Sequence, residues 1–590
     1  MKMIEVQRGV FPGRNRFGPE KCYLRKTGGF FDEKSASFVF FRGMEFNTLT
    51  FYNAYSVAKW RRYTSVDSLY ARLKGKGSVI LQLMLAVPGN TEIVLSEEHV
   101  ELSGHEFNDF EVPEFSELES GHVYFNVIPL DDGQLNYFGF VTATSPEQSV
   151  SLGLVITHFN RQEQVRSAVS RIQDELLSDE EYRENIKLIV VDNSKNSGVV
   201  PDRGVDVIEN ENFGGSGGFS RGLLTLCEDG GYSHCLFMDD DASCEIESLR
   251  RAYKIMMFSN QNDTAIAGSL LDLDAPGVIL EKGAYFDGLC NPLHPKLDVS
   301  SVDGVIEAEQ EFHKPNYGGW WFFGFKISDM KYFPFPFFVR GDDTTFSMVN
   351  GFRILTMNGI CSYGESFKSK NSVMPTYLDT RGHLVKQMAV LDHGRSRVLK
   401  GMCRFYLMSL LSHNYGSARA ATLAVEDVSR GTGFFLDNMD MQARFPVIKQ
   451  ISQSEAVGQC SLEDIEVVYP DQAAIEEGLL RKLFRFSTLN GAILPDFLLK
   501  NGTIYQEKGF RASFREIFRY RNVFYGSPSL NSGYIASFDR VEFFRSLANF
   551  CWAAASFALR FNSIKSEYRT NMPSIMSRNF WQSRFGGEEK

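Results

Sequence analysis

The chain has 590 residues, of which 43% are hydrophobic and 23% are charged, and this length predicts about three to four domains. Lysine and arginine number 62 against 73 aspartates and glutamates, so the net charge of −11 argues against a broad nucleic-acid-binding surface. The nine cysteines include no CxxC pair, and we expect reduced thiols in a cytoplasmic protein. We expect no signal peptide, because the N-terminus has no apolar h-region, and no transmembrane helix, because no uncharged apolar stretch reaches about 18–20 residues.

Residues 1–150 are predicted to form a β domain. Short alternating apolar runs at 35–43, 77–87 and 121–130 are separated by Gly, Asn and Asp turns. This pattern predicts a sandwich or a barrel, an architecture common among carbohydrate-binding modules.

Residues 151–388 are predicted to form an α/β domain. Apolar strands at 151–160, 185–194 and 234–241 alternate with helical segments, which indicates a parallel sheet. In such sheets ligands bind at the carboxyl ends of the strands. The segments THFNR, VDNS and MDDD all fall at strand ends, so we expect them to face one crevice.

Residues 389–590 are predicted to be mainly helical. The segments 396–439 and 539–572 carry apolar residues at helical spacing. No low-complexity linker precedes them, so we expect the three parts to pack firmly.

Three consecutive aspartates end the strand at 234–241. Side chains alternate along a strand, so Asp239 and Asp241 face the same side, about 7 Å apart. Such a pair suits Mg²⁺ or Mn²⁺ together with the oxygens of a diphosphate. The alternative is an acidic turn on the surface.

The segment ENFGGSGGFSRG at 211–222 is predicted to be a glycine loop before a helix. Glycines permit close approach to a ligand, and the helix start with Arg221 favours anions. The segment has neither the dinucleotide-binding nor the P-loop spacing, so a flexible loop is the alternative.

Two adjacent tryptophans, Trp320 and Trp321, lie within NYGGWWFFGF. Neighbouring residues of a strand cannot both point inward, so we expect at least one indole to reach the crevice. The alternative is a corner of the core.

Asp342 and Asp343 follow the apolar segment FPFPFFVRG. One carboxylate, oriented by its neighbour, suits a general base that accepts a proton from a sugar hydroxyl. An N-cap for the next helix is the alternative, and both roles can hold for the two residues.

Together, the motifs THFNR, VVDNS, NFGGSGGFSRG, FMDDDA and FVRGDDTTFS resemble those of the inverting GT-A glycosyltransferases. The closer resemblance is to the galactofuranosyltransferases that polymerise cell-wall galactan from UDP-galactofuranose. The resemblance extends over nearly the whole chain. It implies a multidomain α/β protein whose central GT-A (Rossmann-like) domain lies between an N-terminal β-sandwich or barrel and a C-terminal helical domain.

The resemblance also implies roles for individual residues. Asp343 would be the general base with Asp342 beside it, and Asp239 and Asp241 would hold Mn²⁺ or Mg²⁺. The donor-binding residues would be Thr157, Phe159, Arg161, Asp192, Asn193, Asn212, Gly214, Gly215, Gly217, Arg221, Asp240, Trp320, Trp321 and Arg381.

One position departs from the family. Gly364 stands where the family has a metal-binding histidine, and Glu365 or His383 are candidate substitutes. The implied partners are UDP-galactofuranose and a lipid-linked glycan acceptor, with peripheral association at the cytoplasmic face of the inner membrane and a homo-oligomer left open. The alternatives are a transferase for another UDP-sugar and an inactive glycan-binding homologue.

Overall fold

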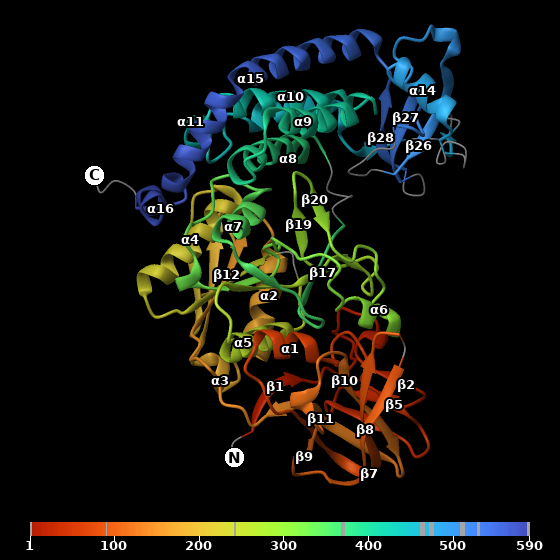
Figure 1. Cartoon of the computed structure of the whole chain (residues 1–590), viewed down its shortest axis with the longest axis vertical. Coiled ribbons are helices and arrows are strands. Elements are labelled where there is room, and N and C mark those ends of the chain that lie inside the picture. The colour runs from red at the N-terminus through yellow and green to blue at the C-terminus, as the bar shows by residue number, and fades with distance from the viewer. Residues whose placement is uncertain are drawn as a thin grey trace.

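The computed structural model describes residues 3–89, 91–240, 243–366, 372–460, 467–470, 477–507, 514–527 and 531–586. Figure 1 shows a β region at the N-terminal end, a central α/β region and a helical region towards the C-terminus. The predicted fold class, in this order along the chain, is confirmed. The domain boundaries at 150 and 388 stay predictions.

The N-terminal region is one antiparallel sheet of eleven strands. Its longest strand, β7, pairs with β9 and β11 through its first half and with β8 and β10 through its second. The short helix α1 (Val57–Tyr63) follows β6. The strands are β1 (Ile4–Arg8), β2 (Arg25–Lys26), β3 (Phe30–Asp32), β4 (Ser37–Phe40), β5 (Phe46–Asn47), β6 (Tyr55–Ser56), β7 (Tyr70–Val87), β8 (Thr91–Ser103), β9 (Asn108–Glu111), β10 (His122–Pro129) and β11 (Gly133–Thr142).

The central sheet has the strand order β14-β13-β12-β15-β21-β16-β22. The first four strands are parallel, as their apolar runs predict, and β21 is antiparallel to both of its neighbours. The strands are β12 (Leu152–His158), β13 (Ile186–Asp192), β14 (Val205–Glu209), β15 (His234–Asp239), β16 (Thr264–Ala267), β21 (Phe323–Lys326) and β22 (Arg353–Leu355).

Helices and two small sheets complete the central region. The small sheets have the orders β18-β17-β23 and β19-β20. These elements are α2 (Gln162–Glu175), α3 (Glu180–Arg183), α4 (Gly214–Asp229), α5 (Ile246–Phe258), α6 (Val302–Glu307), α7 (Asp342–Asn350), β17 (Ser269–Asp272), β18 (Ile279–Glu281), β19 (Ala284–Phe286), β20 (Cys290–Pro292) and β23 (Cys361–Gly364).

The C-terminal region is a helical layer whose outermost helix, α15, crosses it along the edge of the molecule (Figure 1). Helix α8 already belongs to this layer, because its Tyr377 packs with Ala420 and Ala424 of α10. The helices are α8 (Val373–Val385), which runs on into a π-helical turn over Lys386–Val390, α9 (Arg395–Leu410), α10 (Tyr415–Val428), α11 (Thr432–Asp437), α12 (Phe445–Ser452), α15 (Arg540–Ile575) and α16 (Arg578–Phe585).

The sequence did not predict the β unit that interrupts these helices. It contains a sheet of order β24-β28-β27-β26-β25 and the short helix α14. Its elements are β24 (Gly458–Gln459), β25 (Val467–Val468), α14 (Leu479–Ser487), β26 (Lys500–Gln506), β27 (Tyr520–Ser527) and β28 (Ser532–Ser537).

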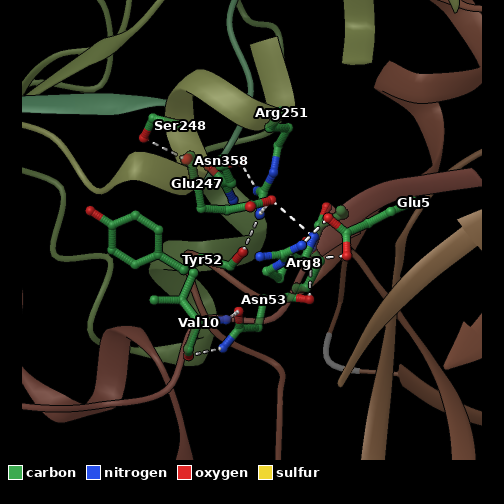
Figure 2. A network of polar contacts seen from close by, with 12 residues as sticks. Glu5, Arg8, Val10, Tyr52, Asn53, Glu247, Ser248, Arg251 and Asn358 are labelled. Atoms are coloured by element: carbon green, nitrogen blue, oxygen red, sulfur yellow. Dashed lines mark hydrogen bonds and ion pairs between the residues drawn. The ribbon is translucent and has the colours of Figure 1, made fainter. Parts of the chain in front are cut away.

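A buried polar network joins the N-terminal sheet to α5 (Figure 2). The Arg251 guanidinium donates to the carbonyl oxygens of Asn358 (2.9 Å) and Tyr52 (2.8 Å) and lies 3.4 Å from the Glu247 carboxylate. The backbone N–H of Arg8 donates to the same carboxylate at 3.0 Å. Burial raises the pKa of Glu247 and lowers that of Arg251, so the pair needs this mutual contact to stay charged.

Within the described residues, no helix combines the length and the apolar character that crossing a lipid bilayer requires.

Candidate active site

The three motifs that we expect to face one crevice lie at the carboxyl ends of β12, β13 and β15. In the parallel register His158 is opposite Asp192, and Thr157 is opposite Asp239. The prediction that THFNR, VDNS and the start of MDDD meet at one edge of the sheet is confirmed. The roles of these residues in binding a donor stay predictions.

Asp240 points into the protein from the end of β15. Its Oδ2 accepts from the backbone N–H of Phe159 at 3.2 Å and lies 3.1 Å from Nδ1 of His158, while Oδ1 lies 4.0 Å from Arg161. Asp240 thereby fixes the loop after β12, where the Phe159 ring is exposed. Sequence reasoning did not single out His158. The only sequence feature that pointed to it is that it is the polar residue at the end of an apolar strand.

Asp192 and Asn193 organise the neighbouring loop. Burial alone would raise the pKa of Asp192, but hydrogen bonds from Ser197 and Ser194 hold that pKa below its usual range. Asn193 donates to the carbonyl oxygen of Gly214 at 3.2 Å and accepts from Asn210 at 2.9 Å. Asn193 therefore connects the end of β13 to the start of α4, and Asp192 fixes the loop that follows β13.

The glycine run is not a loop: Gly214 to Gly222 form the first turns of α4. Asn212 accepts from the N–H of Gly214 at 3.0 Å. A Cβ at Gly214 would lie 2.2 Å from the Phe338 carbonyl oxygen, and one at Gly218 would lie 2.3 Å from Thr157. The glycines thus permit close packing of the helix on β12 and on the loop before α7.

Arg221 stacks its guanidinium over the ring of Phe585 in α16, 5.3 Å from the ring centre. This contact ties α4 to the C-terminal helix. A contact between Arg221 and a donor phosphate stays a prediction. Gly215 and Gly217 lie on the same helical start, where Gly215 approaches the Asp342 carboxylate.

Asp342 and Asp343 open α7, as the sequence predicted. Asp342 is buried, and its Oδ2 accepts from the hydroxyl of Ser216 at 3.0 Å. Burial and the charge of Asp343 raise the pKa of Asp342 to about 7. At neutral pH this carboxyl therefore holds a proton for much of the time.

Asp343 is half-buried, and its Oδ1 accepts from the backbone N–H (2.6 Å) and hydroxyl (3.2 Å) of Thr344. Its charge contributes to raising the pKa of Glu281, which burial brings to about 8. It has the same effect, after burial, on Asp379, Cys290 and Tyr317. Residues of β18, β20 and α8 therefore lie close enough to Asp343 to feel its charge, and sequence reasoning did not find these neighbours.

The loop before α7 has an unusual backbone. Phe338, Arg340 and Gly341 all have left-handed φ values (73°, 67° and 117°), and such residues cluster at functional sites. Arg340 is held by an ion pair of 3.2 Å with Asp379 of α8. This brings a cation and a buried carboxyl close to the general-base candidate.

The expectation that a tryptophan reaches the crevice is wrong for this structure. Trp320 is 5% exposed and Trp321 is 8% exposed. Trp320 packs against Phe219 and Phe237, and Nε1 of Trp321 donates to the Gly268 carbonyl oxygen at 2.8 Å. The pair lies in a turn before β21, so strand alternation does not apply to it.

Arg381 does not face the strand ends. Its guanidinium is enclosed between the rings of Tyr377 and Phe435 and donates to the carbonyl oxygen of Phe337. The expected phosphate contact is thus replaced by interior packing that supports the loop before α7. His383 on the same helix donates from Nδ1 to the Asp379 carbonyl oxygen at 2.7 Å, and burial holds its pKa well below the usual range.

The predicted metal ligands are only partly described, because Asp241 lies outside the described residues. Within those residues, no group of three or more His, Cys, Asp and Glu side chains is arranged to hold a metal ion. A backbone bridge pairs Ser243 with Tyr363, so Gly364 and exposed Glu365 follow directly beside the segment after β15. A donor set of Asp239, Asp241 and Glu365 is all oxygen, which fits Mg²⁺ or Mn²⁺.

The comparisons with known proteins support the resemblance. The chain is 21% identical over 420 residues to the galactofuranosyltransferase GlfT2 of Mycolicibacterium smegmatis, covering 66% of this chain and 64% of that protein. It is 22% identical over 441 residues to GlfT2 of Mycobacterium tuberculosis, with 66% and 65% covered. The match therefore spans slightly less than two thirds of each relative. No protein-family model matches.

Comparison with solved structures gives partial matches. The mannosyltransferase PcManGT of Pyrobaculum calidifontis, in complex with GDP-Man and Mn²⁺, matches 52% of this chain and 85% of its own (13% identity, TM-score 0.28). GalNAc-T7 with UDP, GalNAc and Mn²⁺ matches 41% of this chain and 51% of its own (10% identity, TM-score 0.27). A family 29 carbohydrate-binding module matches 24% of this chain and 93% of its own (12% identity, TM-score 0.16).

Proposed function

We propose that this chain is an inverting glycosyltransferase that moves galactofuranose from UDP-galactofuranose to a hydroxyl group of a glycan acceptor. The observation that carries the proposal is the pair at the start of α7, where half-buried Asp343 lies beside buried Asp342. The similarity to the two mycobacterial galactofuranosyltransferases supports the choice of donor.

In the proposed reaction, Asp343 accepts the proton of the acceptor hydroxyl. The acceptor oxygen forms a bond to the anomeric carbon of the donor sugar on the face opposite the diphosphate, and the bond from that carbon to the diphosphate oxygen breaks. UDP leaves as the anion. Asp342, held by Ser216, positions the start of α7 and limits the negative charge beside the base.

The leaving diphosphate needs positive charge nearby. Arg161 lies at the strand ends and is partly exposed, so its guanidinium suits contact with the diphosphate. Asp239, Asp241 and Glu365 are the residues proposed to hold Mn²⁺ or Mg²⁺, which when bound would neutralise charge on the diphosphate.

The acceptor is proposed to be a lipid-linked or cell-surface glycan, reached by peripheral association with the cytoplasmic face of the inner membrane. Homo-oligomer formation is compatible with the proposal, and nucleic acid is not among the proposed partners.

A donor screen tests the proposal. Purified full-length protein, with Mn²⁺ or Mg²⁺ and a galactan oligosaccharide, is offered UDP-galactofuranose, UDP-galactopyranose and UDP-glucose, and release of UDP is measured. The proposal predicts turnover with UDP-galactofuranose above the other two. Preference for another donor would support the alternative transferase, and absence of turnover with every donor would favour a glycan-binding protein.

A further inference from the structure

The helix α14 presents its apolar side to the outside of the molecule. Leu480 is 84% exposed, and the other apolar residues of α14 and the segment after it are also exposed. We call this set the outer apolar face: Leu479, Leu480, Leu483, Phe484, Phe486, Leu489, Ile493 and Phe497.

The polar side of α14 holds the helix to the protein. Arg485 is 3% exposed, lies 4.9 Å from the centre of the Phe514 ring, and makes two hydrogen bonds with Glu477 just before the helix, at 2.7 and 2.8 Å. Arg481 donates to the carbonyl oxygen of Arg515 at 3.1 Å and lies 5.9 Å from the centre of the Phe518 ring. A surface helix normally does the reverse and buries its apolar side, so this arrangement indicates an apolar partner for the outer face.

A second apolar stripe adjoins this face. Arg540, at the start of α15, donates to the carbonyl oxygen of Leu494 at 2.6 Å and to Asp496 at 2.8 Å. From there Val541, Trp552 and Leu559 lie on the exposed side of α15, opposite its buried phenylalanines. Figure 1 shows α15 along the outer edge of the molecule, leading from the unit that carries α14.

Basic residues near the outer apolar face favour a partner with negative charge. The described residues between 477 and 540 include eight lysines and arginines against five aspartates and glutamates, in a chain whose net charge is −11. Three of these basic residues are exposed: Lys482 within α14, Arg515, whose carbonyl oxygen accepts from Arg481, and Lys500, three positions after Phe497. Leucine and phenylalanine flanked by basic residues is the composition of helices that lie in the interface of anionic membranes.

We propose that the outer apolar face docks on the surface of a membrane that contains anionic lipids. The leucine and phenylalanine side chains enter the boundary between headgroups and acyl chains, and the basic residues contact the lipid phosphates. That this docking brings the active site to a lipid-borne acceptor rests on the proposed function; the docking itself does not.

The test is co-sedimentation of the full-length protein with vesicles, in the absence of any sugar nucleotide. We expect binding to vesicles of phosphatidylcholine mixed with phosphatidylglycerol, weaker binding to pure phosphatidylcholine, and weakening by salt. The double variant Leu480→Glu/Leu483→Glu should bind about tenfold less or weaker still, because two leucines no longer enter the lipid. Lys482→Glu should lower binding about fivefold.

Ile93→Glu/Val94→Glu is the matched control, since these exposed apolar residues lie on β8 in the N-terminal sheet. Equal binding of the α14 variant, the control and the wild type would overturn the proposal, as would failure of the wild type to bind. Sedimentation velocity tests whether a second copy of this chain binds the outer apolar face instead of a membrane. An oligomer that Leu480→Glu/Leu483→Glu dissociates, without any vesicle binding by the wild type, would assign the face to self-association and overturn lipid docking.

Discussion

The hydroxyl of Ser216 donates a 3.0 Å hydrogen bond to Oδ2 of Asp342, joining the glycine-rich start of α4 to the start of α7. Both side chains are buried. The bond links the strand-end side of the site to the candidate general base, Asp343. Asp343 lies 127 positions after Ser216 in the sequence. The loop that leads into α7 has left-handed backbone at Phe338 and Arg340. Such a conformation persists only when surrounding contacts, such as this hydrogen bond, hold it.

Ser216→Ala should lower the rate of sugar transfer about tenfold while leaving UDP affinity within about twofold, since a buried hydrogen bond to a carboxyl is worth about 1–3 kcal/mol. The hydrogen bond from Ser216 lowers the pKa of Asp342, so the variant should also keep Asp342 protonated to higher pH. The control is Ser220→Ala, one turn later in α4, whose hydroxyl donates to the Ser216 carbonyl oxygen. Equal rates for the two variants would contradict the positioning role.

Asp342 should make stability depend on pH. Its pKa is about 7 in the folded protein against an ordinary value of 3.8, so the folded state binds this proton more tightly than the unfolded state. The stabilising effect is complete below about pH 4 and is lost as pH rises through about 7. Asp342→Asn should therefore gain stability relative to wild type between these values, as measured by urea unfolding at a series of pH. A difference that does not change with pH would contradict the raised pKa.

The network of Figure 2 should be a strong contributor to stability. Arg251→Ala leaves the buried Glu247 carboxylate without its guanidinium and should cost about 3–5 kcal/mol. Arg62→Ala, which breaks an ion pair of 2.7 Å with Glu311 near the surface, should cost less than about 1 kcal/mol. Chemical denaturation of both variants gives the comparison, and similar losses would show that burial of Arg251 does not matter.

Gly364→His should tighten binding of Mn²⁺ in the presence of UDP. Gly364 does not have left-handed φ, and a Cβ there would lie 3.0 Å from Cδ1 and 3.9 Å from Cγ of Leu270. The first atom of a histidine side chain therefore needs a small shift of that leucine. Isothermal titration of Mn²⁺ with and without UDP measures the effect. Tight binding by the wild type without nucleotide would show that another residue already completes the site.

The sequence was sufficient to predict those parts of the fold and of the site that depend on residues adjacent in the chain. Apolar runs that end in THFNR, VDNS and MDDD predict parallel strands with polar ends, and the register of His158 with Asp192 confirms it. The start of α7 at Asp342 follows in the same way from a glycine before two aspartates.

Tertiary packing decided the rest. Trp320 is buried because phenylalanines distant in the sequence surround it, and Arg381 is enclosed by rings from α8 and α11. The glycines of α4 resemble a loop in the sequence, yet they serve contact with Thr157 and Phe338. The β unit between α12 and α15 was missed because its strands mix polar and apolar residues instead of forming continuous apolar runs.

The most direct test of the proposed function compares wild type with Asp343→Asn in the transfer of galactofuranose from UDP-galactofuranose to a galactan oligosaccharide, with UDP affinity measured in parallel. Loss of a general base should lower the rate at least about 10²-fold. Folding and UDP affinity should be unchanged, because Asp343 is half-buried and its carboxylate accepts hydrogen bonds from the neighbouring Thr344. Transfer by Asp343→Asn at nearly the wild-type rate would contradict the assignment of the base and the mechanism built on it.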